Sequence, residues 1–357
     1  MTTLLTHSEL LSFAKAAVAA PSADNHHHFE LVYAEDALLI FATAEFRSAP
    51  FHRRILDLIS FGAVAENLVV RAAALGYRAV VTTFPAARDE SPVARIDLQR
   101  SEARLSPLNA SIDTRHTNRR LRFSGPKLIN ADLDAIAGLI EDLPDVQLTF
   151  VERGPARSAL LRLIRIAEAE RFNTPALHEE LFSAVRFDVG WKASVDEGLP
   201  PAALGVEPGM RLAFERLAHW PTMNVLRKLG VHQVLGFRAG SLPCRTAPHI
   251  GVLYTRSSLP AGAMPAGRAL QRIWLDAERR KLAFQPLAAS ALLALPEYLE
   301  VPESTGETLR KGWEALSPLT PVIVFRMGRA KPLARRAGRR GALEHVRSGA
   351  AAGRVSS

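Results

Sequence analysis

The strongest constraint on the fold is a helix that is apolar on nearly every side. Between Ile55 and Leu75 apolar residues recur at helical spacing, and Gly76 follows where a left-handed residue ends a helix. A helix that is hydrophobic all round is buried rather than laid on a surface. Other elements must therefore surround this segment. The positions that set the spacing are Leu58, Phe61, Val64, Ala65, Leu68, Ala72 and Leu75.

Short apolar runs around this helix predict a first structural unit. Leu10–Ala20 has helical spacing and stops at Pro21, and four other runs have the length and composition of strands. Together they predict a compact α+β unit of about 100 residues, to which we assign residues 1–105. The predicted strands are Phe29–Val32, Leu38–Ala42, Ala79–Thr83 and Val93–Leu98.

A second unit is predicted over residues 106–337. It begins with Ser106–Gly125, a polar and basic segment bounded by prolines, which predicts a connection that crosses the surface between the units. Residues 198–240 are cut by prolines into short helices, so we expect a lid-like insertion packed over another part of the chain. The predicted helices are Asp132–Ile140, Ala156–Glu170 and Leu270–Leu282, and the predicted strands are Val146–Val151, His249–Thr255 and Val322–Met327.

The composition is that of an ordinary globular protein. Of the 357 residues 48% are hydrophobic, yet no apolar run reaches the roughly 18 to 20 residues that cross a membrane. Residues 1–11 lack the basic start and the apolar stretch of a signal peptide, so we expect a cytoplasmic protein with no membrane partner. The single cysteine, Cys244, excludes internal disulfides, and we expect a buried structural thiol.

Most of the net charge of +9 lies at the end of the chain. From Arg329 onward, eight Lys or Arg residues stand against the single acid Glu344, a surplus of +7 that leaves +2 for the rest. Residues 338–357 have almost no apolar periodicity, so we expect a disordered, solvated basic tail. Contact of this tail with a phosphate or with RNA is the alternative, and a nucleic-acid partner for the nearly neutral body is not expected.

Several common kinds of catalytic site are missing from the sequence. It contains no dinucleotide-binding glycine pattern, no P-loop and no His-Glu-x-x-His zinc helix. His26, His27 and His28 are adjacent, but alternate strand residues point to opposite faces and no matching ligand set is present. We therefore predict no metal site, and a packed or solvent-facing role for these histidines.

Two polar segments contain residue types that suit a planar ring and a phosphate. Ala20–Asn25 follows a buried helix and offers a hydroxyl, an amide and free backbone N–H groups. In Arg115–Arg119, alternate residues place two guanidinium groups beside a threonine hydroxyl, a set that can hold a phosphate and a ring carbonyl together. By residue type alone, a helix cap and a solvated basic loop are the simpler interpretation.

Taken together, these segments resemble the FMN-dependent nitroreductases. Ala20–Asn25, with the histidines and Phe29 that follow, is similar to their Ala-Pro-Ser-x-x-Asn-x-Gln-Pro-Trp segment. Arg115–Arg119 reads Arg-His-Thr-Asn-Arg and is similar to the Arg-x-Ser-x-Arg/Lys signature with which that family grips FMN. The other similar segments are Ser60–Leu68 for the long central helix, Leu282–Leu287 for a later helix end and Pro321–Arg329 for the last strand.

The order of the segments is reversed relative to ordinary nitroreductases, in which Arg-x-Ser comes first. Their FMN contacts Arg-x-Ser of one subunit and Pro-Ser-x-x-Asn of the other, so this chain resembles both subunits fused, as in the Acg-like branch. The resemblance implies a pseudo-dimer with one composite site. It also implies an α+β, nitroreductase-like fold of two pseudo-symmetric halves, each with a mainly antiparallel sheet flanked by helices.

The resemblance further implies which residues contact FMN. Arg115 would anchor the pyrimidine side or the ribityl chain, Thr117 would bond the ring edge, and Arg119 would face the N1 and O2 region. The full set of expected FMN-binding residues is Pro21, Ser22, Asn25, Arg115, Thr117, Arg119, Gln285, Arg335 and Arg336. The last two arginines of this set would meet the phosphate.

The implied activity is that of an oxidoreductase in which NAD(P)H reduces FMN, and FMN then reduces a small-molecule acceptor by two electrons. Nitroaromatics, quinones and related compounds are the expected acceptors. No catalytic acid or base is required from the chain, because the flavin carries the hydride chemistry. The alternative is a flavin-binding or flavin-storing protein without turnover, covered by the insertion at 198–240. A monomer or a homodimer is expected.

Overall fold

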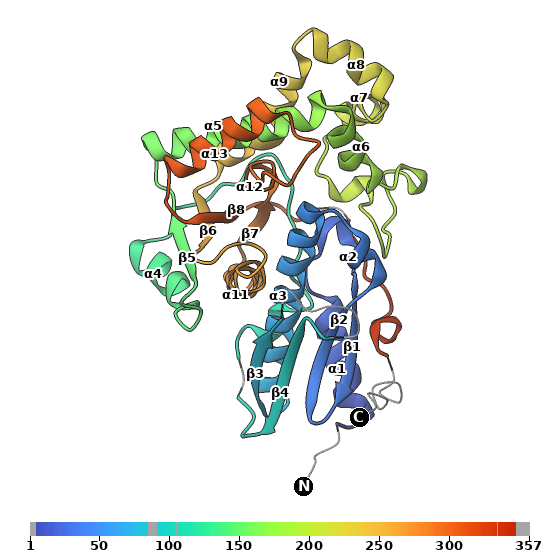
Figure 1. Ribbon diagram of the computed structural model, residues 1–357, viewed down its shortest axis with the longest axis vertical. Helices are drawn as coiled ribbons and strands as arrows, with labels where there is room; N and C mark the ends of the chain where they lie inside the picture. Colours follow the sequence, from blue (N-terminus) through green and yellow to red (C-terminus); the bar gives the residue numbers. More distant parts are fainter. Residues whose placement is uncertain (1–4, 85–90, 105, 334, 348–357) are drawn as a thin grey trace.

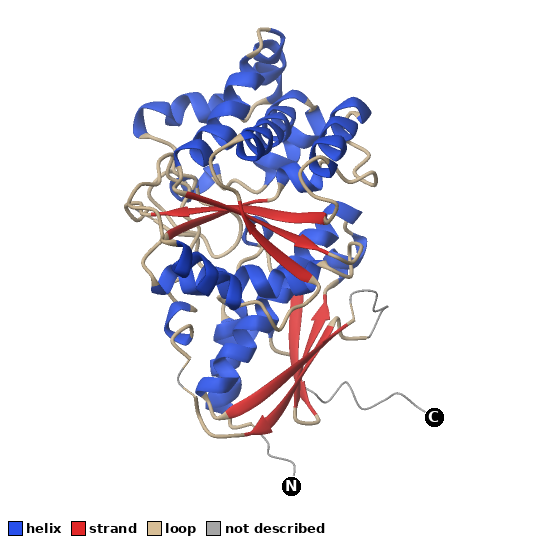
Figure 2. Cartoon of the chain, turned by 90° about the vertical axis from the view of Figure 1, so that its left-hand side faces the viewer, coloured by secondary structure: helices blue, strands red, loops and turns tan. Residues whose placement is uncertain are grey.

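Two antiparallel four-stranded sheets form the framework of the protein in the computed structural model, which describes residues 5–84, 91–104, 106–333 and 335–347 (Figures 1 and 2). The strands of the first sheet are β1 (Phe29–Ala34), β2 (Ala37–Ala42), β3 (Tyr77–Thr83) and β4 (Ala94–Arg100). They lie in the order β1-β2-β4-β3, so β1 is an edge strand. Glu35 and Asp36, at φ of 50° and 57°, make the two-residue turn between β1 and β2, a turn that suits the twist of a hairpin.

The second sheet repeats the strand order of the first. Its strands are β5 (Val146–Phe150), β6 (His249–Thr255), β7 (Ala283–Leu287) and β8 (Thr320–Gly328). Their order is β5-β6-β8-β7, with every neighbouring pair antiparallel. In each unit one long helix follows the second strand, namely α3 (Phe51–Ala74) in the first unit and α11 (Ala263–Arg279) in the second. The predicted antiparallel sheets and the strand His249–Thr255 are confirmed.

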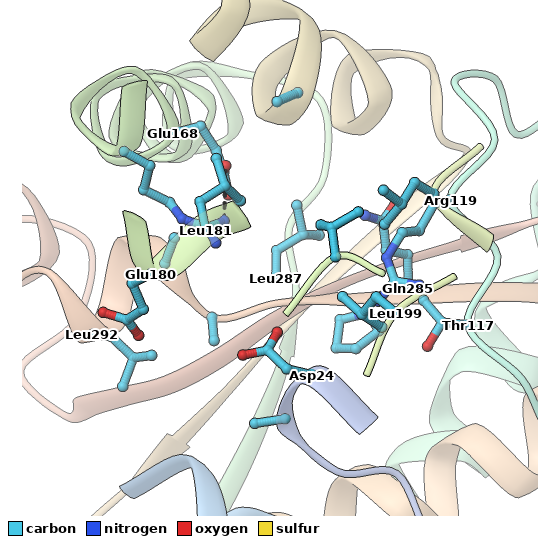
Figure 3. A pocket seen from close by; sticks show the side chains of 18 of the residues that line it. Asp24, Thr117, Arg119, Glu168, Glu180, Leu181, Leu199, Gln285, Leu287 and Leu292 are labelled. Carbon is cyan, nitrogen blue, oxygen red and sulfur yellow. Dashed lines mark hydrogen bonds and ion pairs between the residues drawn. The ribbon is translucent and has the colours of Figure 1, made fainter. Parts of the chain in front are cut away.

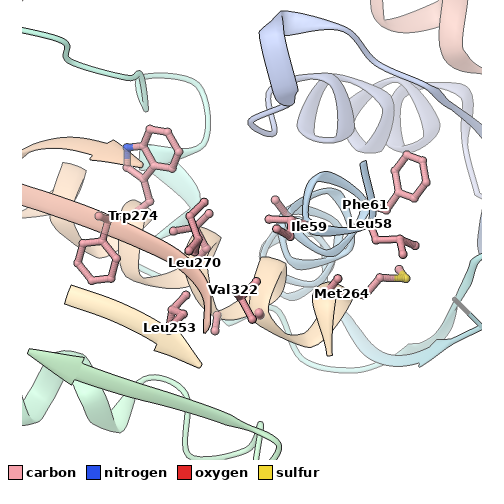
Figure 4. Close-up of a cluster of buried hydrophobic side chains, with 14 of the residues drawn as sticks. Leu58, Ile59, Phe61, Leu253, Met264, Leu270, Trp274 and Val322 are labelled. Carbon is pink, nitrogen blue, oxygen red and sulfur yellow. The ribbon is translucent and has the colours of Figure 1, made fainter. Parts of the chain in front are cut away.

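The two units meet where α3 packs against α11. A Cβ atom at Gly62 of α3 would lie 2.1 Å from the carbonyl oxygen of Met264, and one at Gly267 of α11 would lie 2.0 Å from that of Ile59. Only glycine therefore allows the two backbones to approach this closely. Figure 4 shows Ile59 and Met264 in the same apolar cluster as Val322 of β8. The predicted burial of the central helix is confirmed, since most of α3 is buried.

The remaining helices cover the sheets. In the first unit α1 packs against α3, and in the second unit α5 and α13 lie side by side on the face of the sheet opposite α11 (Figures 1 and 2). The bounds are α1 His7–Val18, α2 Ala44–Ser48, α4 Asn130–Gly138, α5 Pro155–Asn173, α6 Pro175–Ser183, α10 Leu242–Thr246, α12 Ala289–Leu292 and α13 Glu303–Glu314. The helix predicted from Leu270 begins earlier, at Ala263, because a proline is tolerated in the first helical turn.

The insertion at 198–240 consists of short helices that share a small apolar core with α5 and α6. Phe172 of α5, Phe182 of α6 and Met223 of the insertion are buried together in this core. The insertion also packs closely on α5, since a Cβ atom at Gly236 would lie 2.5 Å from the backbone nitrogen of Ala169. Its helices are α7 Arg211–Leu217, α8 Trp220–Lys228 and α9 Val231–Gly236.

Two expectations about exposed segments are wrong in part. The connection Ser106–Gly125 lies partly on the surface, but its few apolar residues, among them Ile112 at 1% exposure, fill a gap between α3 and α11. The tail was expected to be disordered from Gly338, but residues 338–347 pack against the first unit, where His345 is buried. Residues 348–357 lie outside the described residues. Periodicity could not reveal either segment, because each is held by isolated buried side chains.

Candidate functional site

Two adjoining cavities lie between the first unit, the second sheet and the insertion. The larger, cavity A, has a volume of about 460 Å³, and the smaller, cavity B, has a volume of about 150 Å³. Five residues line both cavities and form their common wall: Pro21, Ser22, Thr117, Arg119 and Leu199. The first unit, the connection and the insertion thus meet at one place.

The loop after α1 brings the predicted residues Pro21 and Ser22 to this wall and Asn25 to cavity B. Asp24 and Asn25 have φ of 52° and 62°, a left-handed conformation that asparagine and aspartate tolerate better than most residues. The turn buries Asn25, whose Nδ2 donates to the carbonyl oxygen of Asp196 at 3.1 Å and whose Oδ1 accepts from Arg339 at 2.6 Å. Asn25 therefore joins the first unit to Asp196, just before the insertion, and to the C-terminal segment.

The segment 115–119 runs beside the edge strand β7. The backbone nitrogen of Asn118 donates to the carbonyl oxygen of Phe284 at 2.9 Å, so Thr117 and Arg119 are held at the cavity wall. Arg115 is buried, with its guanidinium 4.4 Å from the ring centroid of Trp274 and its Nη2 donating to the carbonyl oxygen of Ala19 at 2.8 Å. This fixed backbone is what sequence spacing alone could not supply.

Three arginines around cavity B form no ion pair among the described residues, and the acid in the lining of this cavity, Asp113, lies 3.6 Å from Arg71 instead. Burial lowers the pKa of Arg115, of Arg119 and of Arg339, the last to about 10, and the like charge of Arg339 lowers the pKa of Arg115 further. Their recorded hydrogen bonds within the described chain go to carbonyl and amide oxygens. The Nε atoms of Arg115 and Arg339 are buried without a hydrogen-bond partner among the described residues. Cavity B is therefore an electropositive pocket suited to an anion.

Arg272 shows the opposite situation in the same protein. Its guanidinium bonds to Glu66 and Asp142, and these hydrogen bonds and charges raise its pKa although burial opposes ionisation. Arg272 is thus provided with carboxylates, whereas Arg157 and Arg326, like the arginines at cavity B, bond to carbonyl and amide oxygens among the described residues.

The far end of cavity A has a different character. Figure 3 shows Glu168, Glu180 and Leu292 at one end of the cavity and Thr117 and Arg119 at the other. The charges at the far end are paired, with Arg53 donating to Asp24 at 2.8 Å and to Glu180 at 3.2 Å. Burial opposes ionisation of Glu180, but hydrogen bonds from His52 and Tyr298 and the charge of Arg53 lower its pKa to about 2.

Apolar side chains form most of the remaining wall of cavity A. One side comes from the second sheet and α12, and the other from α6 and the insertion. The apolar residues contributed by the insertion include Leu204, Val206, Met210, Phe214, Leu217 and Leu235. Such a wall suits a planar, largely apolar molecule.

Most of the predicted site residues lie together. Pro21, Ser22, Thr117, Arg119 and Gln285 line cavity A, and Pro21, Ser22, Asn25, Arg115, Thr117, Arg119 and Arg336 line cavity B. The exception is Arg335, which lines neither cavity among the described residues and whose Nε donates to the carbonyl oxygen of Lys192 at 3.1 Å. Of these two neighbouring arginines, only Arg336 therefore lies at the site.

Sequence reasoning missed Arg339, which lines cavity B, and Asp24 and Arg53, which line cavity A. Arg339 belongs to the segment expected to be disordered, where no periodicity indicates burial. Arg53 sits near the start of α3, where one charged residue gives no signal of its own. Asp24 lies inside the predicted loop, yet only the positive φ turns it toward the cavity.

The three adjacent histidines have separate partners. His26 lies 3.0 Å from Glu197, and His28 lies 2.9 Å from Asp57. His27 is buried, with its ring 5.5 Å from that of His345. The cysteine, Cys244, is buried as predicted, and burial raises the pKa of its thiol to about 12.

His27 makes the stability of this region dependent on pH. Burial and the charges of Arg339 and His345 lower its pKa from 6.5 to about 3. Below about pH 6.5, His27 binds a proton in the unfolded chain but stays neutral in the folded chain. The free energy of unfolding should therefore fall as the pH decreases toward about 3. Urea unfolding at about pH 7 and about pH 5 should show this loss, and His27→Phe should reduce it. An equal reduction in the control His26→Gln would contradict the assignment.

None of the helices in the described ranges combines the length with the apolarity that a membrane crossing requires.

Comparisons with known proteins give distant similarities. No family model matches the chain. Uncharacterized protein MT1398 of Mycobacterium tuberculosis is 24% identical over 302 residues, which cover 79% of this chain and 39% of that protein. The chain thus spans well under half the length of this curated relative.

The solved structures to which the chain is similar include FMN-dependent nitroreductases. NfnB from Mycobacterium smegmatis, solved with NADPH, is 18% identical with a TM-score of 0.33, over 70% of this chain and 98% of that one. NfnB from Sphigopyxis sp. is 17% identical with a TM-score of 0.37, over 67% and 96%. A nitroreductase with bound FMN from Desulfitobacterium hafniense is 13% identical with a TM-score of 0.34, over 66% and 94%. At these values the likeness carries no argument about activity, which has to rest on the residues of this chain.

Proposed function

We propose that the protein is an FMN-binding oxidoreductase of the nitroreductase type, with the FMN phosphate in cavity B and the ring system in cavity A. One observation carries the proposal. Two segments that resemble separate halves of an FMN site, Pro21–Asn25 and Arg115–Arg119, meet at the common wall of an apolar cavity and an electropositive pocket.

The residues present fit this cofactor. A phosphate monoester has a charge of about −1.5 to −2 and three acceptor oxygens, which suit the unpartnered Nε atoms of Arg115 and Arg339. The two cavity volumes together fall within the range of about 300 to 1,000 Å³ typical of ligand pockets. When bound, FMN would accept a hydride from NAD(P)H and pass two electrons to an acceptor.

The chain's own residues would bind and orient the ring. Arg119 would place a positive charge, and Thr117 a hydroxyl, beside the ring edge. Gln285 already accepts a hydrogen bond from Arg326 through Oε1 at 2.8 Å, which orients its amide and leaves the N–H donors for the ring. The apolar wall would exclude water from the reacting face.

The two units would correspond to the two subunits of an ordinary nitroreductase. Their sheets have the same strand order, and each has its long helix after the second strand. The segment Arg115–Arg119 occurs once, which supports a single composite site in each chain. This arrangement would need no second chain to complete it.

We therefore expect one FMN for each chain. The purified protein, loaded with FMN and freed of excess cofactor, should show flavin bands at about 370 and 450 nm. The ratio of flavin absorbance after release to protein concentration should equal one. A ratio of two would show a second site in the other unit, and failure to retain flavin would overturn the proposal.

A flavin-binding protein without turnover is the second candidate, because the insertion contributes much of the wall of cavity A. Assays of NAD(P)H oxidation with a quinone and with a nitroaromatic separate the two. Reduction of bound flavin by NADH or NADPH, followed by reoxidation on adding acceptor, supports the enzyme. Retained flavin that neither cofactor reduces supports storage.

If the insertion limits access, Phe214→Ala should increase turnover with bulky acceptors. The ring of Phe214 lines cavity A, and its removal should raise kcat/KM for a bulky quinone by about tenfold while a small quinone is little affected. Leu212→Ala is the matched control, since this residue lies on the same helix α7 with 66% exposure. Equal effects in both variants would contradict a lid-like role.

A further inference from the structure

The C-terminal segment 335–347, here called the strap, runs from the second unit back to the first. It first follows residues 192–197. The Oγ of Ser194 donates to the carbonyl oxygen of Arg336 at 2.6 Å, and the backbone nitrogen of Gly338 donates to the carbonyl oxygen of Val195 at 2.7 Å. In Figure 1 the strap ends beside β1, far along the fold from β8. It therefore bridges the two units on the side of cavity B.

The far end of the strap is anchored on the first sheet. The ring of His345 stacks on that of Phe29 with centroids 5.0 Å apart, and its Nδ1 bonds the carbonyl oxygen of Phe29 at 3.2 Å. Val346 forms a β-bridge with Leu31, and the backbone nitrogen of Arg347 donates to the carbonyl oxygen of Leu31 at 3.0 Å. The strap thus adds hydrogen bonds to the edge strand β1 and buries a ring there.

The middle of the strap supplies charge to cavity B. Arg336 and Arg339 both line this cavity, and Arg339 is held there by its hydrogen bond to Asn25. The next residue, Arg340, pairs with Glu197, whereas the partners of Arg339 among the described residues are amide and carbonyl oxygens. Arg339, and not Arg340, therefore contributes an unpaired charge to the lining of the cavity, as far as the described residues show.

We propose that Arg339 binds the phosphate in cavity B and that docking of the strap through His345 holds Arg339 in place. Binding of the anion and docking of the strap then stabilise each other, since any coupling between two binding events is reciprocal. This inference rests on the proposed function, because FMN is the phosphate ester concerned.

The test compares FMN with riboflavin, which has the same ring system and no phosphate. Arg339→Gln and His345→Ala should each weaken FMN binding by about tenfold or more, the effect of losing a charge-assisted hydrogen bond, and should leave riboflavin affinity nearly unchanged. Leu343→Ala, a change at a strap residue with 53% exposure, should alter neither affinity. Dissociation constants come from quenching of flavin fluorescence on titration with the full chain.

The reciprocal effect is measured on the strap itself. FMN should protect the strap from trypsin, which cleaves after arginine, and should slow amide exchange at residues 340–347, whereas riboflavin should do neither. Arg339→Gln removes one cleavage site, so digestion is followed at the other strap arginines, where the variant should lose the protection by FMN and the free protein should be cleaved as in wild type. These readouts do not require turnover.

The possible outcomes distinguish a failure of the strap proposal from a failure of the proposed FMN binding. If wild type binds FMN but the variants bind it equally well, or if FMN and riboflavin are weakened alike, the strap has no role in phosphate binding. If wild type binds neither flavin, the proposed function fails and this inference with it. Should His345→Ala not fold, the protection of residues 340–347 by FMN in wild type and its loss in Arg339→Gln decide, since Arg339→Gln changes a half-buried side chain at a cavity wall.

Discussion

Replacing Arg115 by methionine is expected to raise the Kd for FMN by roughly 10- to 100-fold. Arg115 is buried against Trp274 with its Nε unpartnered, so its charge gains a full partner only when an anion occupies cavity B. Losing a hydrogen bond to a charged group costs about 1.5 to 3 kcal/mol, and each 1.4 kcal/mol is a factor of ten.

The free protein should respond differently to the same change. Without an anion, Arg115 is a desolvated charge, and an apolar side chain of similar length can replace such a group with little loss of stability. Thermal unfolding of Arg115→Met without flavin should therefore stay close to that of wild type, while the stabilisation that FMN gives to wild type should largely disappear.

Arg335→Met is the control for this experiment. Arg335 is also a predicted phosphate ligand, but its guanidinium contacts the carbonyl of Lys192 outside both cavities. We expect its FMN affinity to stay within about twofold of wild type, the scale of a surface substitution. Unchanged affinity in Arg115→Met, or a large loss in Arg335→Met, would contradict the assignment of cavity B.

Changing Gly62 to alanine should destabilise the whole molecule. The new Cβ atom would lie 2.1 Å from a backbone oxygen of α11, and a backbone atom cannot turn aside as a side chain can. Overpacking usually destabilises a protein by about 1 to 3 kcal/mol. Because the new methyl group would push α3 and α11 apart, we expect Gly62→Ala to cost about 3 kcal/mol or more. The free energy of unfolding, measured by urea titration, should fall accordingly.

Gly138→Ala in α4 provides the matched comparison. The nearest atom to its Cβ would be a side-chain oxygen of Glu141 at 3.6 Å, an ordinary contact. Alanine inside a helix is favoured over glycine by about 0.5 to 1 kcal/mol, so Gly138→Ala should be neutral or stabilising. Equal effects at the two glycines would show that the contact of α3 with α11 is looser than described.

The long-range features of this fold differ in how far the sequence predicts them. The burial of α3 was predictable, because apolar residues cover most of its circumference and such a helix has to be surrounded by other elements. The strand β7 was not, because it is short and contains Pro286. Amphipathic patterns thus identify long elements that bury a face, and they miss a short strand that contains a proline, even where its side chains are buried as those of Phe284 and Leu287 are.

The residues of the site likewise differ in how far the sequence predicts them. The segments around Ser22 and Thr117 were identifiable by resemblance, and the structure brings both to one wall. The sequence could not identify Arg339 as a site residue, because its burial depends on Asn25, which lies more than 300 positions earlier in the chain. A neighbouring basic residue such as Arg335 has the same local context and a different environment, so only the path of the strap distinguishes them.

The joining of both units in one chain across α3 and α11 has a consequence for assembly. A site built from two separate polypeptides comes apart on dilution, because its formation depends on the concentration of both. Here the segments that supply Ser22 and Thr117 belong to one molecule. Their effective concentration relative to each other is therefore fixed by the intervening chain and does not depend on the protein concentration. The cavities should therefore persist unchanged from nanomolar to millimolar protein, and any dependence of ligand affinity on protein concentration would have to arise from contacts outside them.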